Sequence, residues 1–274
     1  MTRTALITGA ARPLGLGQAI AMRLAADGCD ILLHDRGATE GDIAPAHGVG
    51  VAEDLEMTAQ KIRDTTGQRV ATVTGDLLKY SSITAIVAAA DAYFGRLDIL
   101  VNNAGIGYLF GPLTEADTNR LDAVLGVNLR APMLLTGQAA LLMIRGDAGG
   151  RVINIASQAA KSGFAFASAY TASKHGLLGF TRSAALELGP HGITVNAVCP
   201  NHVTTGLGAW QNDFMSKARG EKLDEYLANM RARIPLGRTG RPEDTANAVS
   251  FLCSEQAAYM TGEAMNVSGG EEYH

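Results

Sequence analysis

The stretch TALITGAARPLGLG, residues 4–17 of this 274-residue chain, is the first indication of its fold. A short apolar run, Ala5–Ile7, passes into a turn that contains Gly9, Gly15 and Gly17, and a helical pattern follows. Glycines let the backbone turn tightly and approach a pyrophosphate, which the N-terminus of a helix attracts through its free N–H groups. The spacing differs from the plain GxGxxG fingerprint, so the turn alone fits a phosphate site and simple close packing about equally well.

The same alternation of short apolar runs and longer amphipathic stretches continues to the end of the chain. Strands are predicted where the runs are short and rich in Ile, Leu and Val, at residues 4–7, 30–33, 69–73, 97–101, 151–155 and 194–198. Helices are predicted over 17–26, 52–65, 81–94, 115–144 (interrupted near Pro132), 168–188 and 242–254. Buried strands connected through helices form a doubly wound parallel sheet, the Rossmann type of α/β fold. We therefore expect one domain, residues 1–274, with a long loop over 36–51 and a partly helical segment over 204–235 that covers the site.

The composition excludes several classes of protein. Hydrophobic residues make up 47% of the chain and charged residues 18%, which favours a packed core over disorder. The net charge is −4 and no basic run exceeds two residues, so we expect no nucleic-acid partner. The apolar stretch 131–144 contains polar residues and falls short of the roughly 20 residues of a membrane helix. The three cysteines lack disulfide or zinc-ligand spacing, and we expect a cytoplasmic protein without a metal.

An acidic residue ends the second predicted strand. Asp35 lies 18 residues beyond Gly17, where a carboxylate can accept hydrogen bonds from the hydroxyls of an adenosine ribose. A carboxylate there repels a 2′-phosphate and favours NAD over NADP, whereas Arg12 and Arg36 act weakly in the opposite direction. A solvated aspartate in a turn is the simpler alternative.

A second group of polar residues lies in the C-terminal half of the chain. Tyr170 and Lys174 are four residues apart in a predicted helix, so the phenol and the ammonium share one face. Ser157 follows the predicted strand 151–155 and precedes Tyr170 by 13 residues. The three side chains can therefore meet at the carboxyl edge of the sheet, where ligands of this fold bind.

Together with these residues, other motifs make the chain resemble the short-chain dehydrogenase/reductase family over nearly all of its length. The turn Thr8-Gly9…Gly15-Leu16-Gly17 resembles the cofactor turn of the family, with Pro13-Leu14 as a two-residue insertion. Later matches are Asp76-Leu77, Asn102-Asn103-Ala104-Gly105, Asn128, Pro200…Val203-Thr204-Thr205, Pro235-Leu236-Gly237-Arg238, Met260-Thr261-Gly262 and Val267-Ser268-Gly269-Gly270. The resemblance implies that NAD or NADP is bound by Thr8, Gly9, Arg12, Gly15, Leu16, Gly17, Asp35, Asp76, Leu77, Asn103, Ala104, Gly105, Tyr170, Lys174, Pro200, Val203 and Thr205.

The resemblance also implies a catalytic tetrad of Asn128, Ser157, Tyr170 and Lys174 and an oxidoreductase that acts on CH–OH groups. Tyr170 takes the alcohol proton while hydride leaves for the nicotinamide, Ser157 holds the reacting oxygen, and Asn128 anchors a water that relays the proton. A free tyrosine has a pKa near 10, and the charges of Lys174 and of the oxidised nicotinamide are expected to lower it. Lys174 also holds the nicotinamide ribose.

The residues best placed to touch a substrate are Ser157, Gln158, Asn201, His202 and Trp210, together with Gln211 and Asn212. Amides and an imidazole both donate and accept hydrogen bonds, which suits neighbouring hydroxyls, so we expect a small sugar or polyol. Asn201 stands where the family usually places a glycine. A surface helix whose polar residues face solvent explains the segment around Trp210 equally well.

Two other functions fit the same fold. A reductase of carrier-bound 3-oxoacyl thioesters would use NADPH and a basic entrance, for which Arg130 and Arg151 are the candidates. A non-catalytic regulator that binds the cofactor would lack part of the tetrad, whereas all four residues are present. The long apolar faces over 115–144 and 168–188, together with the resemblance, predict a homotetramer.

Overall fold

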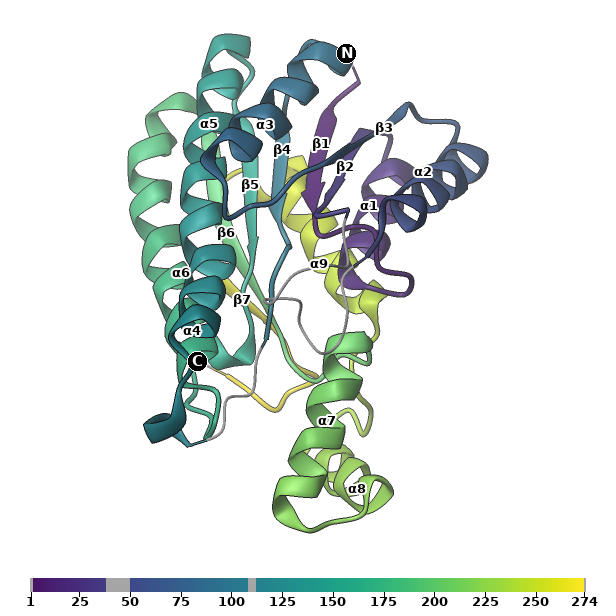
Figure 1. The fold of residues 1–274 in the computed structure, drawn as a ribbon. Helices are drawn as coiled ribbons and strands as arrows, with labels where there is room; N and C mark the ends of the chain where they lie inside the picture. Colours follow the sequence, from purple (N-terminus) through teal and green to yellow (C-terminus); the bar gives the residue numbers. More distant parts are fainter. Residues whose placement is uncertain (1, 38–49, 108–111, 274) are drawn as a thin grey trace.

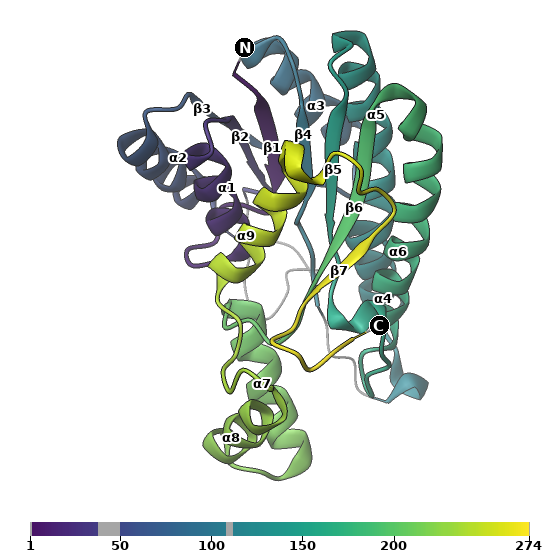
Figure 2. The same ribbon diagram turned by 180° about the vertical axis from the view of Figure 1, so that it is seen from behind.

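A computed structural model describes residues 2–37, 50–107 and 112–273 of the chain (Figures 1 and 2). Most of the loop predicted over 36–51 lies outside the described residues. The strands form one parallel sheet in the order β3-β2-β1-β4-β5-β6-β7. They are β1 (Thr4–Thr8), β2 (Asp30–Asp35), β3 (Val70–Thr74), β4 (Ile99–Asn102), β5 (Gly150–Ile155), β6 (Ile193–Pro200) and β7 (Ala264–Val267).

Helices cover both faces of this sheet, as Figures 1 and 2 show from opposite sides. Those used below are α1 (Leu16–Ala26), α2 (Ala52–Thr66), α3 (Tyr80–Phe94), α4 (Thr118–Leu125), α5 (Ala131–Gly146), α6 (Ser168–Leu188), α7 (Gly206–Arg219), α8 (Leu223–Arg233) and α9 (Pro242–Cys253), with a π-helical turn η2 (Gly126–Arg130) and a 3-10 turn η3 (Gln158–Ala160). The architecture is the predicted doubly wound Rossmann type.

Alternate residues of each central strand enter the two apolar cores. Ile7 and Ile31 pack with residues of α1, α2 and α9, whereas Leu6 and Leu32 pack with residues of α3, α5 and α6. Successive side chains of a strand point to opposite faces, and both faces are covered here, so the strand sequences are apolar throughout. This is why short Ile, Leu and Val runs located the central strands correctly.

Two elements differ from the prediction. The predicted strands did not include β7, whose residues Ala264–Val267 are only partly buried at the edge of the sheet. The interruption predicted near Pro132 lies just before it, as the π-helical turn η2 between α4 and α5. Pro132 itself is the second residue of α5, and its missing N–H falls directly after the π-helical turn, where the hydrogen-bond register of the helix changes.

Within the described residues, one continuous helical stretch, Thr118–Gly146, is long and apolar enough to cross a membrane. It has 29 residues because helical geometry continues through η2, so it extends well beyond the apolar stretch 131–144. Half of its most apolar window is buried in the protein, which is typical of a core helix.

Helices α7 and α8 project beyond the carboxyl ends of the strands (Figure 1). They lie in the segment 204–235 that was predicted to cover the site. Ligands of open α/β sheets bind at this edge.

Candidate active site

The turn after β1 is a backbone cradle that leaves no room for side chains. Gly9 has a φ of +70°, and a Cβ there would lie 2.8 Å from the Cα of Ala104. A Cβ at Gly17 would lie 2.3 Å from the carbonyl oxygen of Gly9. The Asn103 amide holds this arrangement, because its Nδ2 donates to the carbonyl oxygens of Thr8 (2.8 Å) and Gly9 (3.0 Å). The backbone can therefore approach a ligand as closely as a pyrophosphate requires.

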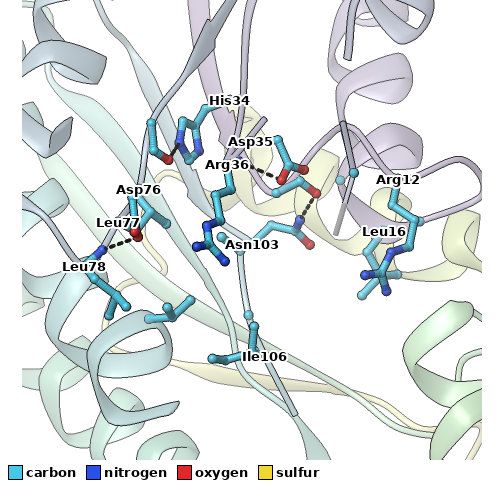
Figure 3. A pocket seen from close by; sticks show the side chains of 18 of the residues that line it. Arg12, Leu16, His34, Asp35, Arg36, Asp76, Leu77, Leu78, Asn103 and Ile106 are labelled. Atoms are coloured by element: carbon cyan, nitrogen blue, oxygen red, sulfur yellow. Dashed lines mark hydrogen bonds between the residues drawn. The ribbon is translucent and has the colours of Figure 1, made fainter. Parts of the chain in front are cut away.

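A cavity of about 190 Å³ opens from this cradle across the ends of β1, β2, β3 and β4 (Figure 3). The predicted cofactor residues that line it are Gly9, Arg12, Gly15, Leu16, Gly17, Asp35, Asp76, Leu77, Asn103, Ala104, Gly105 and Thr205. Thr8 lies behind the cradle, where its Oγ1 accepts hydrogen bonds from the backbone N–H groups of Asn103 (3.1 Å) and Ala104 (3.0 Å). Pro200 and Val203 line a second cavity instead.

The carboxylate of Asp35 is held in place at the end of β2. Its oxygens accept hydrogen bonds from the backbone N–H groups of Ala11 (2.9 Å) and Arg36 (2.8 Å), and the residue is 9% exposed. In Figure 3, Asp35 lies between the side chains of Arg12 and Arg36. Asp35 is therefore a fixed part of the wall and not a solvated residue of a turn.

Sequence reasoning missed His34, which also lines this cavity. Its imidazole is buried, and Nε2 lies 3.0 Å from the carbonyl oxygen of Gly75. Burial lowers the pKa of His34, so the ring is neutral near pH 7. The position of His34 next to Asp35, at the end of a predicted strand, is the feature of the sequence that could have indicated it as a site residue.

The four predicted catalytic residues come together at the ends of β4, β5 and α6. Ser157 and Tyr170 share a hydrogen bond between their side chains. The Lys174 ammonium donates to the carbonyl oxygen of Ile155 at 2.7 Å and lies 5.6 Å from the centre of the Tyr170 ring. Spacing alone predicted this encounter, because residues four apart share a helix face.

Asn128 is positioned by the π-helical turn η2. Its Nδ2 donates to the carbonyl oxygen of Ile106 (2.8 Å) and to Ser173 Oγ (3.2 Å). Its Oδ1 accepts from the backbone N–H of Ile106 at 2.9 Å. Single π-helical turns are frequent at functional sites because they shift one residue out of the ordinary helical register.

Burial dominates the titration of the catalytic pair. It raises the pKa of Tyr170, and the hydrogen bond with Ser157 offsets only part of that shift. It lowers the pKa of Lys174 to about 8. We expected the charges of Lys174 and of the oxidised nicotinamide to lower the pKa of Tyr170. In this structure burial raises that pKa, and the Lys174 ammonium bonds to the carbonyl oxygen of Ile155.

A second cavity, of about 480 Å³, lies between the catalytic residues and the helices α7 and α8. The predicted substrate residues that line it are Ser157, Gln158, Asn201, His202, Gln211 and Asn212, beside Tyr170. Trp210 is not among the residues that line it, and its ring centre lies 6.1 Å from that of Phe214.

Three charged residues of this cavity had no signal in the sequence. Glu271 accepts hydrogen bonds from Asn201 Nδ2 and from Arg233 Nε (3.3 Å), and lies 3.5 Å from His202 Nε2. Arg219 and Arg233, at the ends of α7 and α8, line the cavity and are exposed. Burial lowers the pKa of His202. The negative charge of Glu271 acts to raise this pKa, and the positive charge of Arg233 acts to lower it further.

Known proteins match the chain over almost its whole length. The family model described as enoyl-(acyl carrier protein) reductase matches residues 9–272. L-2,3-butanediol dehydrogenase of Corynebacterium glutamicum is 35% identical over 276 residues, covering 100% of both chains. Carveol dehydrogenase from Mycobacterium avium, solved in complex with NAD, has a TM-score of 0.90 and 30% identity over 98% of this chain and 97% of that chain. Actinorhodin polyketide ketoreductase, solved with NADPH, has a TM-score of 0.88 and 34% identity over 100% and 98%.

These matches agree with the cradle, the tetrad and the sheet order. The proteins with which the chain aligns from end to end are dehydrogenases and reductases that act on alcohols and ketones. The chain belongs to the short-chain dehydrogenase/reductase family of oxidoreductases, which use a nicotinamide cofactor.

Proposed function

We propose that this protein oxidises a secondary alcohol of a small polyol or sugar, with NAD as the preferred hydride acceptor. The observation that carries the proposal is the meeting of Ser157 and Tyr170 with a polar cavity wall that includes Gln158, Asn201 and Glu271. The 2,3-butanediol dehydrogenase of Corynebacterium glutamicum supports a small diol or polyol as the class of substrate.

The described residues fit a nicotinamide dinucleotide. A Cβ at Gly9 or Gly17 would fill the cradle, and Asp35 presents a carboxylate held by two backbone N–H groups. When bound, an oxidised nicotinamide would supply the hydride acceptor for the carbinol carbon, and its positive charge, present until the hydride is transferred, would favour ionisation of the phenol. Asp76 and Leu77 line the first cavity and would contact the adenine, and Pro200, Val203 and Thr205 would hold the nicotinamide.

The residues of this chain supply the proton transfer. Tyr170 accepts the alcohol proton at its phenolic oxygen, and Ser157 donates a hydrogen bond that fixes the reacting oxygen. Lys174 holds its ammonium at the base of the site through Ile155. Asn128, whose amide is bonded on both sides, would position the water that carries the proton outward.

The preference for NAD rests on Asp35. A carboxylate at the end of β2 accepts hydrogen bonds from ribose hydroxyls and repels a 2′-phosphate. Arg12 and Arg36 flank it and weaken this repulsion.

A panel of alcohols with both cofactors tests the proposal. Butane-2,3-diol, galactitol and smaller polyols should reduce NAD faster than NADP, measured as the rate of NADH or NADPH formation. Activity confined to long-chain or steroid alcohols would exclude a polyol substrate, and NADP preferred throughout would exclude the cofactor assignment.

A second candidate is reduction of 3-oxoacyl thioesters with NADPH, as the likeness to the polyketide ketoreductase suggests. Arg151 cannot form a basic entrance for a carrier, because it is 8% exposed and bonds to Gly150 and Glu255. Arg219 and Arg233 favour this candidate instead, because they place positive charge beside the substrate cavity. Acyl thioesters therefore belong in the same panel.

We also propose that the protein is a cytoplasmic homotetramer. Free, buried thiols at Cys29, Cys199 and Cys253 suit a reducing compartment. Large apolar side chains are exposed on α5 and α6, among them Leu141 (64%) and Leu186 (82%), and subunit contacts would cover them. Light scattering that gave a 28.6 kDa particle at micromolar concentration would contradict the tetramer.

A further inference from the structure

We propose that the C-terminal tail, residues 268–273, selects the substrate by turning two amide side chains so that they act only as hydrogen-bond acceptors. The inference rests on the proposed function and sharpens it. The substrate class it assigns is an alcohol with at least one further hydroxyl that donates a hydrogen bond next to the reacting group.

The tail follows β7 and places Glu271 in the wall of the cavity and Glu272 against Gln158, which lines it. Glu271 accepts a hydrogen bond from Asn201 Nδ2, across a separation of 70 residues. Glu272 Oε1 accepts one from Gln158 Nε2 at 2.5 Å and another from Ser162 Oγ at 3.3 Å. A turn keeps both in place, because Ser268 Oγ accepts from the backbone N–H of Glu272 at 3.3 Å.

These bonds settle the orientation of both amides. A carboxylate accepts and never donates, so only the NH₂ end of an amide can face it. Asn201 and Gln158 therefore direct their NH₂ groups toward the tail. The side-chain carbonyl oxygens of Asn201 and Gln158 accept no hydrogen bond from any residue that the structure describes. Neither oxygen is among the fully buried polar atoms that lack a hydrogen-bond partner. Each oxygen remains accessible as an acceptor.

The wall beside Ser157 and Tyr170 thus presents two amide oxygens and the Glu271 carboxylate, which is 13% exposed. Acceptors of this kind bind hydroxyl groups and leave ester, thioester or carboxylate oxygens without donors. The two arginines of the cavity are exposed; Arg233 bonds to Glu271, and Arg219 lies over the Tyr226 ring at 5.5 Å. The other neutral amide donors that line the cavity, Gln211 and Asn212, come from α7 and not from the wall of Gln158 and Asn201, and His202 lies against Glu271. A diol therefore gains contacts that a mono-alcohol or an acyl thioester lacks.

The test compares butane-2,3-diol with butan-2-ol, which has the same carbon skeleton and one hydroxyl fewer, at saturating NAD. Glu271→Gln removes the charge and frees Asn201 to rotate, and Gln158→Met removes the second acceptor. For each variant we expect the ratio of kcat/KM for the diol to kcat/KM for the mono-alcohol to fall about tenfold. A loss of about this size is usual when a polar group of the substrate is left without its hydrogen-bond partner. Glu225→Gln, an equal charge change at an exposed residue of α8, should leave the ratio unchanged.

The outcomes separate the two proposals. A wild-type enzyme that oxidises neither alcohol but reduces a 3-oxoacyl thioester overturns the proposed function, and this inference with it, before any variant is needed. A wild-type enzyme that prefers the diol, with equal losses on both alcohols in Glu271→Gln and Gln158→Met, overturns this inference alone. Circular dichroism of both variants checks their fold, and Gln158→Met tests the acceptor wall with the Asn201–Glu271 bond retained.

Discussion

The cofactor cradle and the substrate cavity lie at the same edge of the sheet but are built differently. The cradle consists of backbone turns directly after β1, β2, β3 and β4, where Gly9 and Gly17 are required because a Cβ would clash. The substrate cavity is assembled from segments distant in sequence, such as Gln158 with Glu272 and Asn201 with Glu271. The cradle depends on local geometry, whereas the cavity depends on how the chain end packs against the rest.

This difference predicts which changes each region tolerates. A substitution in the cradle meets backbone atoms that cannot move, so binding and stability suffer together. A substitution in the cavity meets side chains and alters selectivity while the fold persists. Substitutions in the two regions should therefore differ in whether binding, stability or selectivity changes.

Tyr170→Phe should lower kcat by about 10² to 10⁴-fold, because the ring keeps its packing and only the proton acceptor is lost. The dissociation constant for NAD, measured by fluorescence titration, should change little. Tyr93→Phe, at an exposed tyrosine of α3, is the control. A Tyr170→Phe enzyme that retained more than about a few per cent of kcat would show that another group is the base.

Lys174 should make stability depend on pH. Its pKa in the folded protein is about 8, below its ordinary value of 10.5, so the unfolded chain binds more protons between these values. The free energy of unfolding should therefore rise by about 2–3 kcal/mol from pH 8 to pH 10. Above pH 10 the raised pKa of Tyr170 acts in the opposite direction, because the buried phenol resists ionisation.

Urea unfolding at several pH values measures this dependence. Lys174→Met should flatten the rise, whereas Lys61→Met, at an exposed lysine, should leave it intact. The same slope in wild type and Lys174→Met would mean that the buried ammonium is not its source.

Gly17→Ala should destabilise the fold by about 1–3 kcal/mol and weaken NAD binding, because the new Cβ lies 2.3 Å from the Gly9 oxygen. Gly137→Ala is the matched control, since no atom lies within 4 Å of a Cβ at that helical position. It should stabilise α5 by up to about 1 kcal/mol. Thermal melts and NAD titrations of both variants measure the two effects. Equal changes in stability and in NAD affinity for Gly17→Ala and Gly137→Ala would contradict the prediction.

Asp35→Ala should narrow the preference for NAD over NADP about tenfold in kcat/KM, because repulsion of the 2′-phosphate is relieved. The loss of the bonds from Ala11 and Arg36 should lower activity with both cofactors. Asp64→Ala removes an equal charge at an exposed residue of α2 and should not alter the ratio. If the ratio of kcat/KM with NAD to kcat/KM with NADP is unchanged in Asp35→Ala, a residue other than Asp35 determines the cofactor preference.

Local patterns of the sequence determined the sheet, its covering helices and the meeting of Ser157, Tyr170 and Lys174. Buried parallel strands leave an apolar signature, and residues four apart on a helix must share a face. The edge strand β7 was missed because its four residues, Ala264–Val267, include Asn266 and do not form the continuous Ile, Leu and Val run that marked the central strands. The π-helical turn that positions Asn128 has no periodic signature of its own.

The wall of the substrate cavity, in contrast, depends on contacts between distant segments of the folded chain. The sequence around Glu271 and Glu272 contains no motif that predicts their hydrogen bonds with Asn201 and Gln158. Those bonds depend on where β7 ends and on how the tail folds back toward the cavity. The pKa values of Tyr170 and Lys174 also depend on the packed structure, because burial is the main cause of both shifts. Sequence order determines which groups a helix or a turn presents, whereas desolvation and contacts between distant segments exist only once the chain has packed.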